Sequence, residues 1–169
     1  MRRCKVCRAQ EFDAATTDLH RTVAGTTFAA TLTAMKCRAC GDTELDPMAA
    51  TAFELQVAAE LVRMGRPTAE AFRFMRKALG FRGPQLAELL GVDRGTLSRW
   101  ENGVLRVDRG AFVVLGGLVI ERLSGRDDTL ARLKALHKPV QASSTVVRIE
   151  CTRAGMPSAH STTSPPSAA

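Results

Sequence analysis

The amino-acid sequence predicts a mainly α-helical protein that begins with a small β-rich domain. Before about residue 46, Thr and apolar residues alternate over short runs, which is typical of β-strands. After it, apolar residues recur every three or four positions, which is the spacing of one buried helix face. Four of the five cysteines also lie in the first 40 residues, so the two parts differ in chemistry as well as in pattern.

The early cysteines form two Cys-x-x-Cys pairs, Cys4 with Cys7 and Cys37 with Cys40, about thirty residues apart. Each pair can sit on a tight turn that presents two thiolates to one metal ion, and two such turns complete a tetrahedron. Two disulfides, or iron held by the same ligands, are the alternatives. Because cysteine fills all four positions, the pattern predicts one structural zinc ion per chain and no catalytic metal.

Between the two pairs, the segment from Thr16 to Met35 predicts two or three antiparallel strands with a turn near Gly25. So short a sheet buries little apolar surface by itself, so the metal is expected to supply folding energy. We interpret residues 1–46 as a zinc-binding domain. Apolar residues at helical spacing then predict a helix over 49–64, within a connecting segment at 47–66.

Residues 72–103 read FRFMRKALGFRGPQLAELLGVDRGTLSRWENG and predict three short helices joined by two tight turns. Pro84 suits the first turn of the second helix, Gly91 suits the turn after it, and Asp93 suits the N-cap of the third. The polar outer face of the third helix holds Arg94, Gly95, Ser98 and Arg99. A helix of this width fits the major groove of DNA, where Arg can form two hydrogen bonds with guanine. A merely solvated charged face is the alternative.

The segment LAELLGVDRGTLSRWENG resembles the Xre/Cro type of repressor helix-turn-helix. In that family an Arg of the first helix pairs with the Glu that ends the recognition helix, which here implies a structural pair of Arg76 and Glu101. The family opens its second helix with Ser or Thr followed by Gln, whereas this chain has Arg82 and Gly83. The resemblance makes the following residues candidates for DNA contact: Arg82, Gln85, Arg94, Gly95, Thr96, Ser98 and Arg99. Because Gly95 has no side chain, base recognition is expected from Arg94, Ser98 and Arg99.

Two further helices are predicted, one from about residue 108 to Leu123 and one from about residue 128 to His137. The first has too many apolar residues for one buried face, so part of the stretch from Phe112 to Leu123 is expected to contact a second copy of the chain. We therefore interpret residues 67–138 as a five-helix domain for DNA binding and homodimerisation, with a palindromic operator. The Ser-, Thr- and Pro-rich segment 139–169, which contains Cys151, is predicted to be a disordered tail.

The net charge of +7 favours a polyanionic partner. No stretch is long and apolar enough to span a membrane, and no apolar segment follows Arg2 and Arg3, so we expect a cytoplasmic protein without membrane association. No cluster of His, Asp and Glu, no nucleophile motif and no phosphate-binding loop indicates an enzyme.

A four-cysteine domain followed by an Xre-type helix-turn-helix resembles the MqsA antitoxins, also called YgiT-type zinc finger proteins. The resemblance covers about residues 1–137 and rests on the two cysteine pairs and on the motif that ends in SRWENG. It implies a zinc domain that binds and blocks a toxin, often an RNA-cleaving one, and a second domain that represses the operon of both proteins. A zinc-ribbon adaptor without a toxin partner is the alternative from another class.

Overall fold

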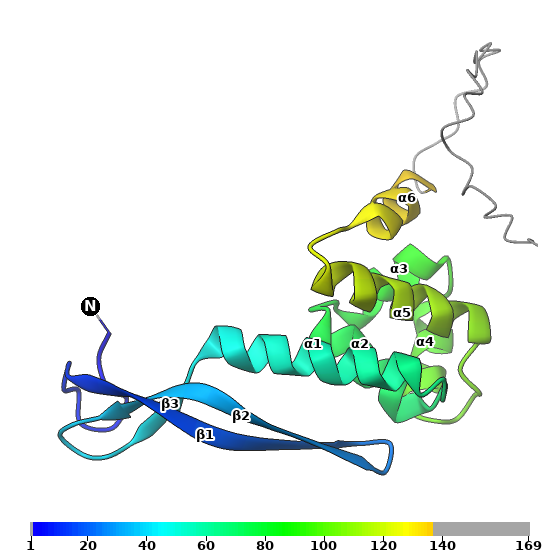
Figure 1. Ribbon diagram of the computed structural model, residues 1–169. Coiled ribbons are helices and arrows are strands. Elements are labelled where there is room, and N and C mark those ends of the chain that lie inside the picture. Colours follow the sequence, from blue (N-terminus) through cyan, green and yellow to red (C-terminus); the bar gives the residue numbers. More distant parts are fainter. Residues whose placement is uncertain (1, 137–169) are drawn as a thin grey trace, which may run out of the picture. The chain divides into compact units, whose positions relative to one another are not determined.

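The computed structural model describes residues 2–136 (Figure 1). Its elements, in chain order, are the strands β1 (Phe12–Val23), β2 (Thr26–Cys37) and β3 (Thr43–Leu45) and the helices α1 (Pro47–Arg63), α2 (Ala69–Ala78), α3 (Gly83–Leu90), α4 (Arg94–Glu101), α5 (Arg109–Leu123) and α6 (Asp128–Leu136). The predicted fold class is confirmed, since a small antiparallel sheet precedes a helical part. The predicted tail at 139–169, with Cys151, lies outside the described residues.

The sheet is built on a long hairpin in which β1 pairs with β2 from Phe12 and Cys37 to Val23 and Thr26. Ala24 and Gly25 form its two-residue turn, and both have positive φ (51° and 75°), as a type I′ turn requires. The strands extend beyond the predicted segment from Thr16 to Met35, because their pairing continues to Phe12 and to Cys37 of the second cysteine pair. β3 adds only a short third strand, opposite residues 34–36 of β2.

Helix α1 belongs to the helical core and is more than a connection. Asp46 caps its N-terminus by accepting a hydrogen bond from the Met48 amide at 3.0 Å. Its buried face packs in one hydrophobic core with residues of α2 and α5. A Cβ atom at Gly116 of α5 would lie 3.0 Å from Val62 Cγ1, so this glycine lets α1 and α5 approach closely. The packing explains why α1 is stably placed against the helices that follow it.

The three predicted helices at 72–103 are α2, α3 and α4, and local capping defines their ends. Thr68 accepts a hydrogen bond from the Ala71 amide at 3.1 Å, and Asp93 accepts one from the Thr96 amide at 2.8 Å. Gly91, at φ 66°, ends α3 in the left-handed conformation. The rings of Phe72 (α2) and Trp100 (α4) meet edge to face with centroids 5.9 Å apart, so α4 is anchored to α2.

The turn of the hairpin packs on the helical part. Val23 is buried in the helical core, and the Ala24 amide donates a hydrogen bond to Glu70 of α2 at 2.8 Å. Arg21 of β1 forms an ion pair with Glu54 of α1 at 2.9 Å. These contacts fix one end of the hairpin, while its opposite end carries the cysteine pairs. Within residues 2–136, no helix is long and apolar enough to cross a membrane.

Candidate nucleic-acid interface and candidate metal centre

Helix α4 presents a polar outer face, because Leu97 and Trp100 are buried on its inner side. Arg94, Gly95, Ser98 and Arg99 are all exposed, and Thr96 is half-buried. The structure therefore brings the α4 residues predicted to contact DNA onto one accessible surface. A helix held in this way by its apolar face can present its polar face to the major groove.

The N-terminus of α4 is organised by a chain of hydrogen bonds. Asp93 accepts hydrogen bonds from the amide and the hydroxyl of Thr96, and the Thr96 oxygen in turn accepts one from Arg99 Nη2 at 2.9 Å. The Thr96 hydroxyl and amide lower the pKa of Asp93, so this cap is ionised near neutral pH. A Cβ atom at Gly95 would lie 2.9 Å from Asp93 Oδ1. A larger residue at this position would therefore crowd the capping carboxylate, whereas glycine leaves it in place.

Arg76 and Glu101 form a two-pronged ion pair between α2 and the end of α4. Arg76 Nη2 lies 3.0 Å from Glu101 Oε2, Arg76 Nε lies 2.5 Å from Oε1, and each side chain is 12% exposed. Arg76 also donates to the Phe81 carbonyl at 2.7 Å, which ties it to the α2–α3 turn. The pair thus fixes α4 relative to both preceding elements.

The start of α3 differs from the arrangement that the resemblance implies. Arg82 and Gln85 are both exposed, as a DNA contact requires. However, Gln85 Oε1 accepts a hydrogen bond from the Arg82 amide at 2.9 Å and so caps α3. The Gln85 amide nitrogen is therefore the part of that side chain that is free to act as a donor towards DNA.

Arg73 of α2 is a positioning residue that the sequence pattern does not predict. Its Nη2 atom donates to the Glu101 carbonyl at 2.6 Å and to Asn102 Oδ1 at 2.9 Å. A cation at the C-terminus of a helix is favourable, because the last carbonyl groups carry partial negative charge. The helical spacing of Arg73 and Arg76 on α2 was the available signal, since both lie on the side that meets the end of α4.

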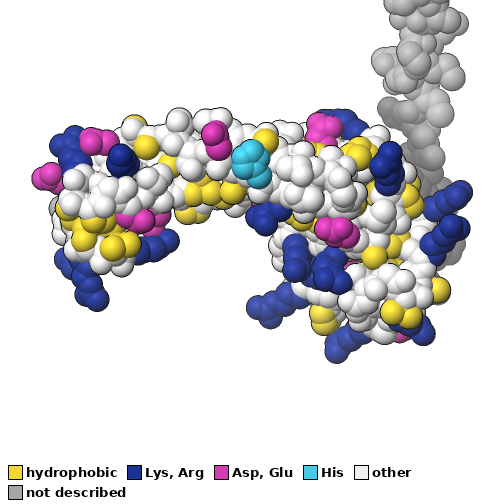
Figure 2. Space-filling model, turned by 90° about the horizontal axis from the view of Figure 1, so that it is seen from below, with side chains coloured by type: hydrophobic (Ala, Val, Ile, Leu, Met, Phe, Trp, Pro, Cys, Tyr) yellow, Lys and Arg dark blue, Asp and Glu magenta, His cyan; other side chains and the backbone are white. Residues whose placement is uncertain are grey.

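Positive side chains gather at two places in the described chain. Figure 2 shows Lys and Arg over the helical end and again around the cysteine loops, with few on the hairpin between them. Part of the charge near the cysteines is paired, because Glu44 of β3 binds both Arg2 and Lys5 at 2.7 Å. Hydrogen bonds from Lys5 and Arg2 lower the pKa of Glu44. These ion pairs hold the first cysteine loop against the sheet.

The four cysteines Cys4, Cys7, Cys37 and Cys40 come together at the open end of the hairpin, with all their Sγ atoms within 4.8 Å of one another. The two loops have the same local geometry. The fifth residue of each loop has positive φ and donates its amide to the carbonyl of the first cysteine, as Arg8 does to Cys4 at 3.0 Å and Gly41 to Cys37 at 2.9 Å.

The spacing of the sulfur atoms fits a metal ion and does not fit disulfides. Cys4 and Cys40 have their Sγ atoms 3.6 Å apart, as do Cys7 and Cys37, whereas a disulfide bond is about 2.05 Å long. Four thiolates at about 2.3 Å from a tetrahedral zinc ion would lie about 3.8 Å from each other. The cluster can therefore hold one metal ion with all four cysteines as ligands.

The thiols differ in acidity. The backbone amides of Cys40 and Ala39 lower the pKa of Cys37 to about 7. The backbone amide at Asp42 lowers the pKa of Cys40, but the neighbouring Cys7 thiol and burial raise it more, to about 12. Four thiolates cannot share so small a space without a compensating cation, so metal binding must release protons from this cluster.

The model of the Helix-turn-helix family matches residues 72–108. The matched segment holds α3, α4 and most of α2, so it coincides with the exposed α4 surface and its supporting ion pair. That family is a type of DNA-binding regulator and is generally not enzymatic. No curated protein and no solved structure is significantly similar to the chain. The domain supports a DNA-binding regulator with a separate four-cysteine centre.

Proposed function

We propose that the protein is a sequence-specific transcriptional regulator that reads DNA through α4. The exposed face of α4, supported from beneath by the Arg76–Glu101 pair, is the observation that carries this proposal. Arg99 and Arg94 are the side chains that donate to base edges, and Ser98 lies beside them. Arg82 and Gln85, at the start of α3, contact the phosphate backbone and so contribute affinity without sequence preference.

The four-cysteine centre holds one structural zinc ion in this proposal. Thiolates bind zinc strongly, and four of them leave no position for a substrate or a reactive water. Zinc joins the loop before β1 to the end of β2 and thereby closes the hairpin. Metal analysis of the purified protein tests this assignment and distinguishes zinc from iron.

The regulator acts as a dimer whose contact lies on α5. A surface groove of about 730 Å³ lies there, and Val113, 70% exposed, and Ile120 line it. Gly117 lies between them, and a Cβ atom there would meet no other atom within 4 Å, which leaves room for a second helix. A two-fold dimer requires a palindromic operator with half-sites about one helical turn, or a multiple of it, apart. Sedimentation of wild type and Val113→Glu tests this contact, because a charge at its centre should give monomers.

The combination of both centres in one chain supports the role of an antitoxin of a type II toxin–antitoxin pair. In this role the four-cysteine half binds the toxin and the helical half represses the operon that encodes both proteins, as the resemblance to the MqsA antitoxins implies. The toxin gene is expected to lie beside the gene for this protein. A solitary gene would instead favour an adaptor without a toxin.

The direct test uses a duplex from immediately upstream of the protein's own coding sequence and a scrambled duplex of the same length. The proposal predicts much tighter binding to the upstream duplex, and a footprint with two-fold symmetry. Equal binding of both duplexes at physiological salt would contradict a sequence-specific regulator, because phosphate contacts alone do not discriminate between sequences.

A further inference from the structure

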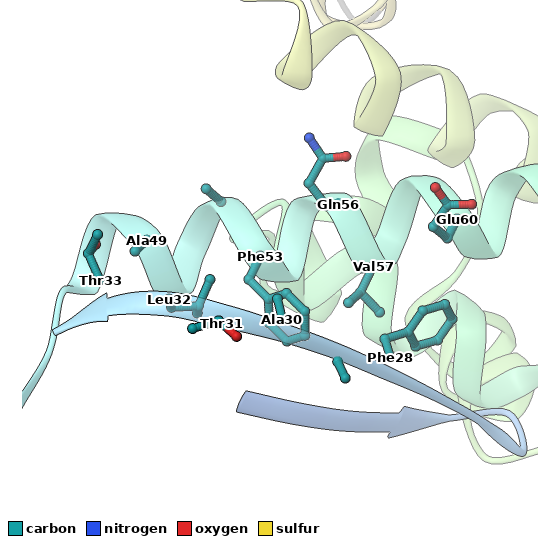
Figure 3. A pocket seen from close by; sticks show the side chains of 12 residues that line it. Phe28, Ala30, Thr31, Leu32, Thr33, Ala49, Phe53, Gln56, Val57 and Glu60 are labelled. Atoms are coloured by element: carbon teal, nitrogen blue, oxygen red, sulfur yellow. The ribbon is translucent and has the colours of Figure 1, made fainter. Parts of the chain in front are cut away.

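An apolar groove of about 540 Å³ runs between β2 and α1 (Figure 3). Six consecutive residues of β2, 28–33, line one side. Successive side chains of a strand point to opposite faces, so a groove lined by six in a row follows the strand's edge. Phe53 and Val57 point from α1 towards β2, and Gln56 and Glu60 also line the groove.

The edge of β2 along this groove has backbone groups that no strand pairs. The Thr33 carbonyl accepts the Asp46 amide at 3.2 Å and the Cys37 amide donates to Asp42 at 2.8 Å, so these residues point their polar backbone groups away from β1. In an antiparallel ladder this direction alternates, so Thr27, Ala29 and Thr31 point the same way. β3 ends before it reaches them, and within residues 2–136 no backbone group pairs with them on that side.

The two open edges of the sheet differ in charge. β1 carries Asp13, Asp18 and Arg21, whereas β2 has no charged residue between Thr26 and Thr33. Natural sheets usually protect an open edge with charges, with proline or with a covering element. The β1 edge follows that rule, but the β2 edge beside the groove lacks charge and proline, so it is suited to pair with another strand.

We propose that this groove binds an extended, uncharged strand of a partner protein, which adds to β2 in line with β3. The backbone groups of Thr27, Ala29 and Thr31 provide the hydrogen bonds, and every second side chain of the added strand enters the groove beside Phe53 and Val57. Apolar side chains at those alternate positions are therefore required of the partner. The inference deepens the proposed function, since it assigns to the four-cysteine half the surface through which it binds a partner protein.

The probe is a fluorescein-labelled seven-residue peptide of alternating Thr and Val, titrated into the full-length, zinc-loaded protein. We expect saturable binding by fluorescence anisotropy. In amide hydrogen exchange by NMR, the amides of Thr27, Ala29 and Thr31 should become protected, while those of Phe28 and Ala30, which already face β1, should not change. The same peptide with every backbone amide N-methylated should not bind, because it has no N–H donor at either edge and its methyl groups prevent a close approach to β2.

Two substitutions test the site itself. Ala29→Pro removes an outward-pointing amide without removing a hydrogen bond between β1 and β2, and should weaken peptide binding about tenfold or more. Thr16→Pro is the matched control, because it removes an outward-pointing amide at the β1 edge, and should change binding less than about twofold. Ala52→Glu places a charge in the groove from α1 without altering the sheet, and should also weaken binding about tenfold. Metal content and helical circular dichroism verify that each variant is folded.

Several results would overturn this inference: no saturable binding, equal binding by Ala29→Pro and Thr16→Pro, or new protection at the β1 edge. Protection of the same three amides that grows with protein concentration in the absence of peptide would assign the groove to a second copy. Protection that disappears when residues 139–169 are deleted would assign it to this chain's own C-terminal segment, and would also overturn the proposal. DNA binding is measured in parallel, so a failure here is distinguishable from a failure of the proposed regulator function.

Discussion

Phe72, Leu86 and Leu115 of the helical part are fully buried, whereas the most buried residues of the sheet and its cysteine loops, away from the helices, are Cys4, Cys37 and Ala34. The helices thus share an apolar core that can stabilise them in the absence of a ligand. The sheet has almost no core of its own, and two of its best-buried side chains are candidate metal ligands. The two halves therefore depend on different interactions and should unfold under different treatments.

Loss of one metal ligand should have the largest effect and should separate the two halves. Structural zinc contributes on the order of 10 kcal/mol of folding free energy in small domains. Cys37→Ser should therefore unfold the hairpin beyond its turn and leave the helices folded. The amide chemical shifts of residues 12–37 should lose their dispersion in NMR spectra, while the helical circular dichroism signal should remain. Cys151→Ser is the control, because that cysteine lies outside the two pairs. Full metal content in Cys37→Ser would contradict the four-cysteine assignment.

The second effect concerns the helical half alone. Glu101→Ala leaves the Arg76 guanidinium mostly buried without its carboxylate partner, which should lower the free energy of unfolding by about 3 kcal/mol. Urea denaturation followed by circular dichroism measures this loss of unfolding free energy. Glu88→Ala, on an exposed part of α3, should change little. If both variants unfolded at the same urea concentration, the ion pair would not be what fixes α4.

The third effect is the pH dependence of the α4 N-cap. Because the pKa of Asp93 is lowered in the folded protein, its ionised form stabilises α4 at pH values above the ordinary aspartate pKa of about 4. This stabilisation is lost as the pH falls through the lowered pKa. The protection factor of the Thr96 amide, which is its exchange rate corrected for the intrinsic rate at each pH, should therefore fall below about pH 4, and Asp93→Asn, which caps without titrating, should remove that dependence. An unchanged pH profile in Asp93→Asn would show that another group is responsible.

The features that could be predicted from the sequence are those set by short local motifs. The ends of α3 and α4 follow from Pro84, Gly91 and Asp93, each of which acts within a turn of its own position. The meeting of the two cysteine pairs follows from their spacing, because each Cys-x-x-Cys turn supplies two ligands and two such turns are needed to complete one tetrahedral metal site. The chemistry of the helix ends is contained in a few neighbouring residues, and that of the cysteine cluster in two short Cys-x-x-Cys turns.

The features that could not be predicted depend on contacts between distant segments. β3 is only three residues long and is recognisable only through its pairing with β2. The role of Arg73 depends on where α4 ends, and the capping role of Gln85 depends on the conformation of the residues before it. The open edge of β2 results from the early end of β3, which no pattern within β2 itself reveals.

The central claim, that α4 reads DNA sequence while α3 provides affinity, is tested most directly by comparing Arg99→Ala with Arg82→Ala. Each variant is titrated with the upstream duplex and with the scrambled duplex over a range of salt concentrations. Arg99→Ala should lose about 1–3 kcal/mol of discrimination between the two duplexes. Arg82→Ala should weaken both complexes about equally and lower the slope of log affinity against log salt by about one. Full discrimination in Arg99→Ala would contradict the account, because the exposed face of α4 would then not be the surface that recognises DNA.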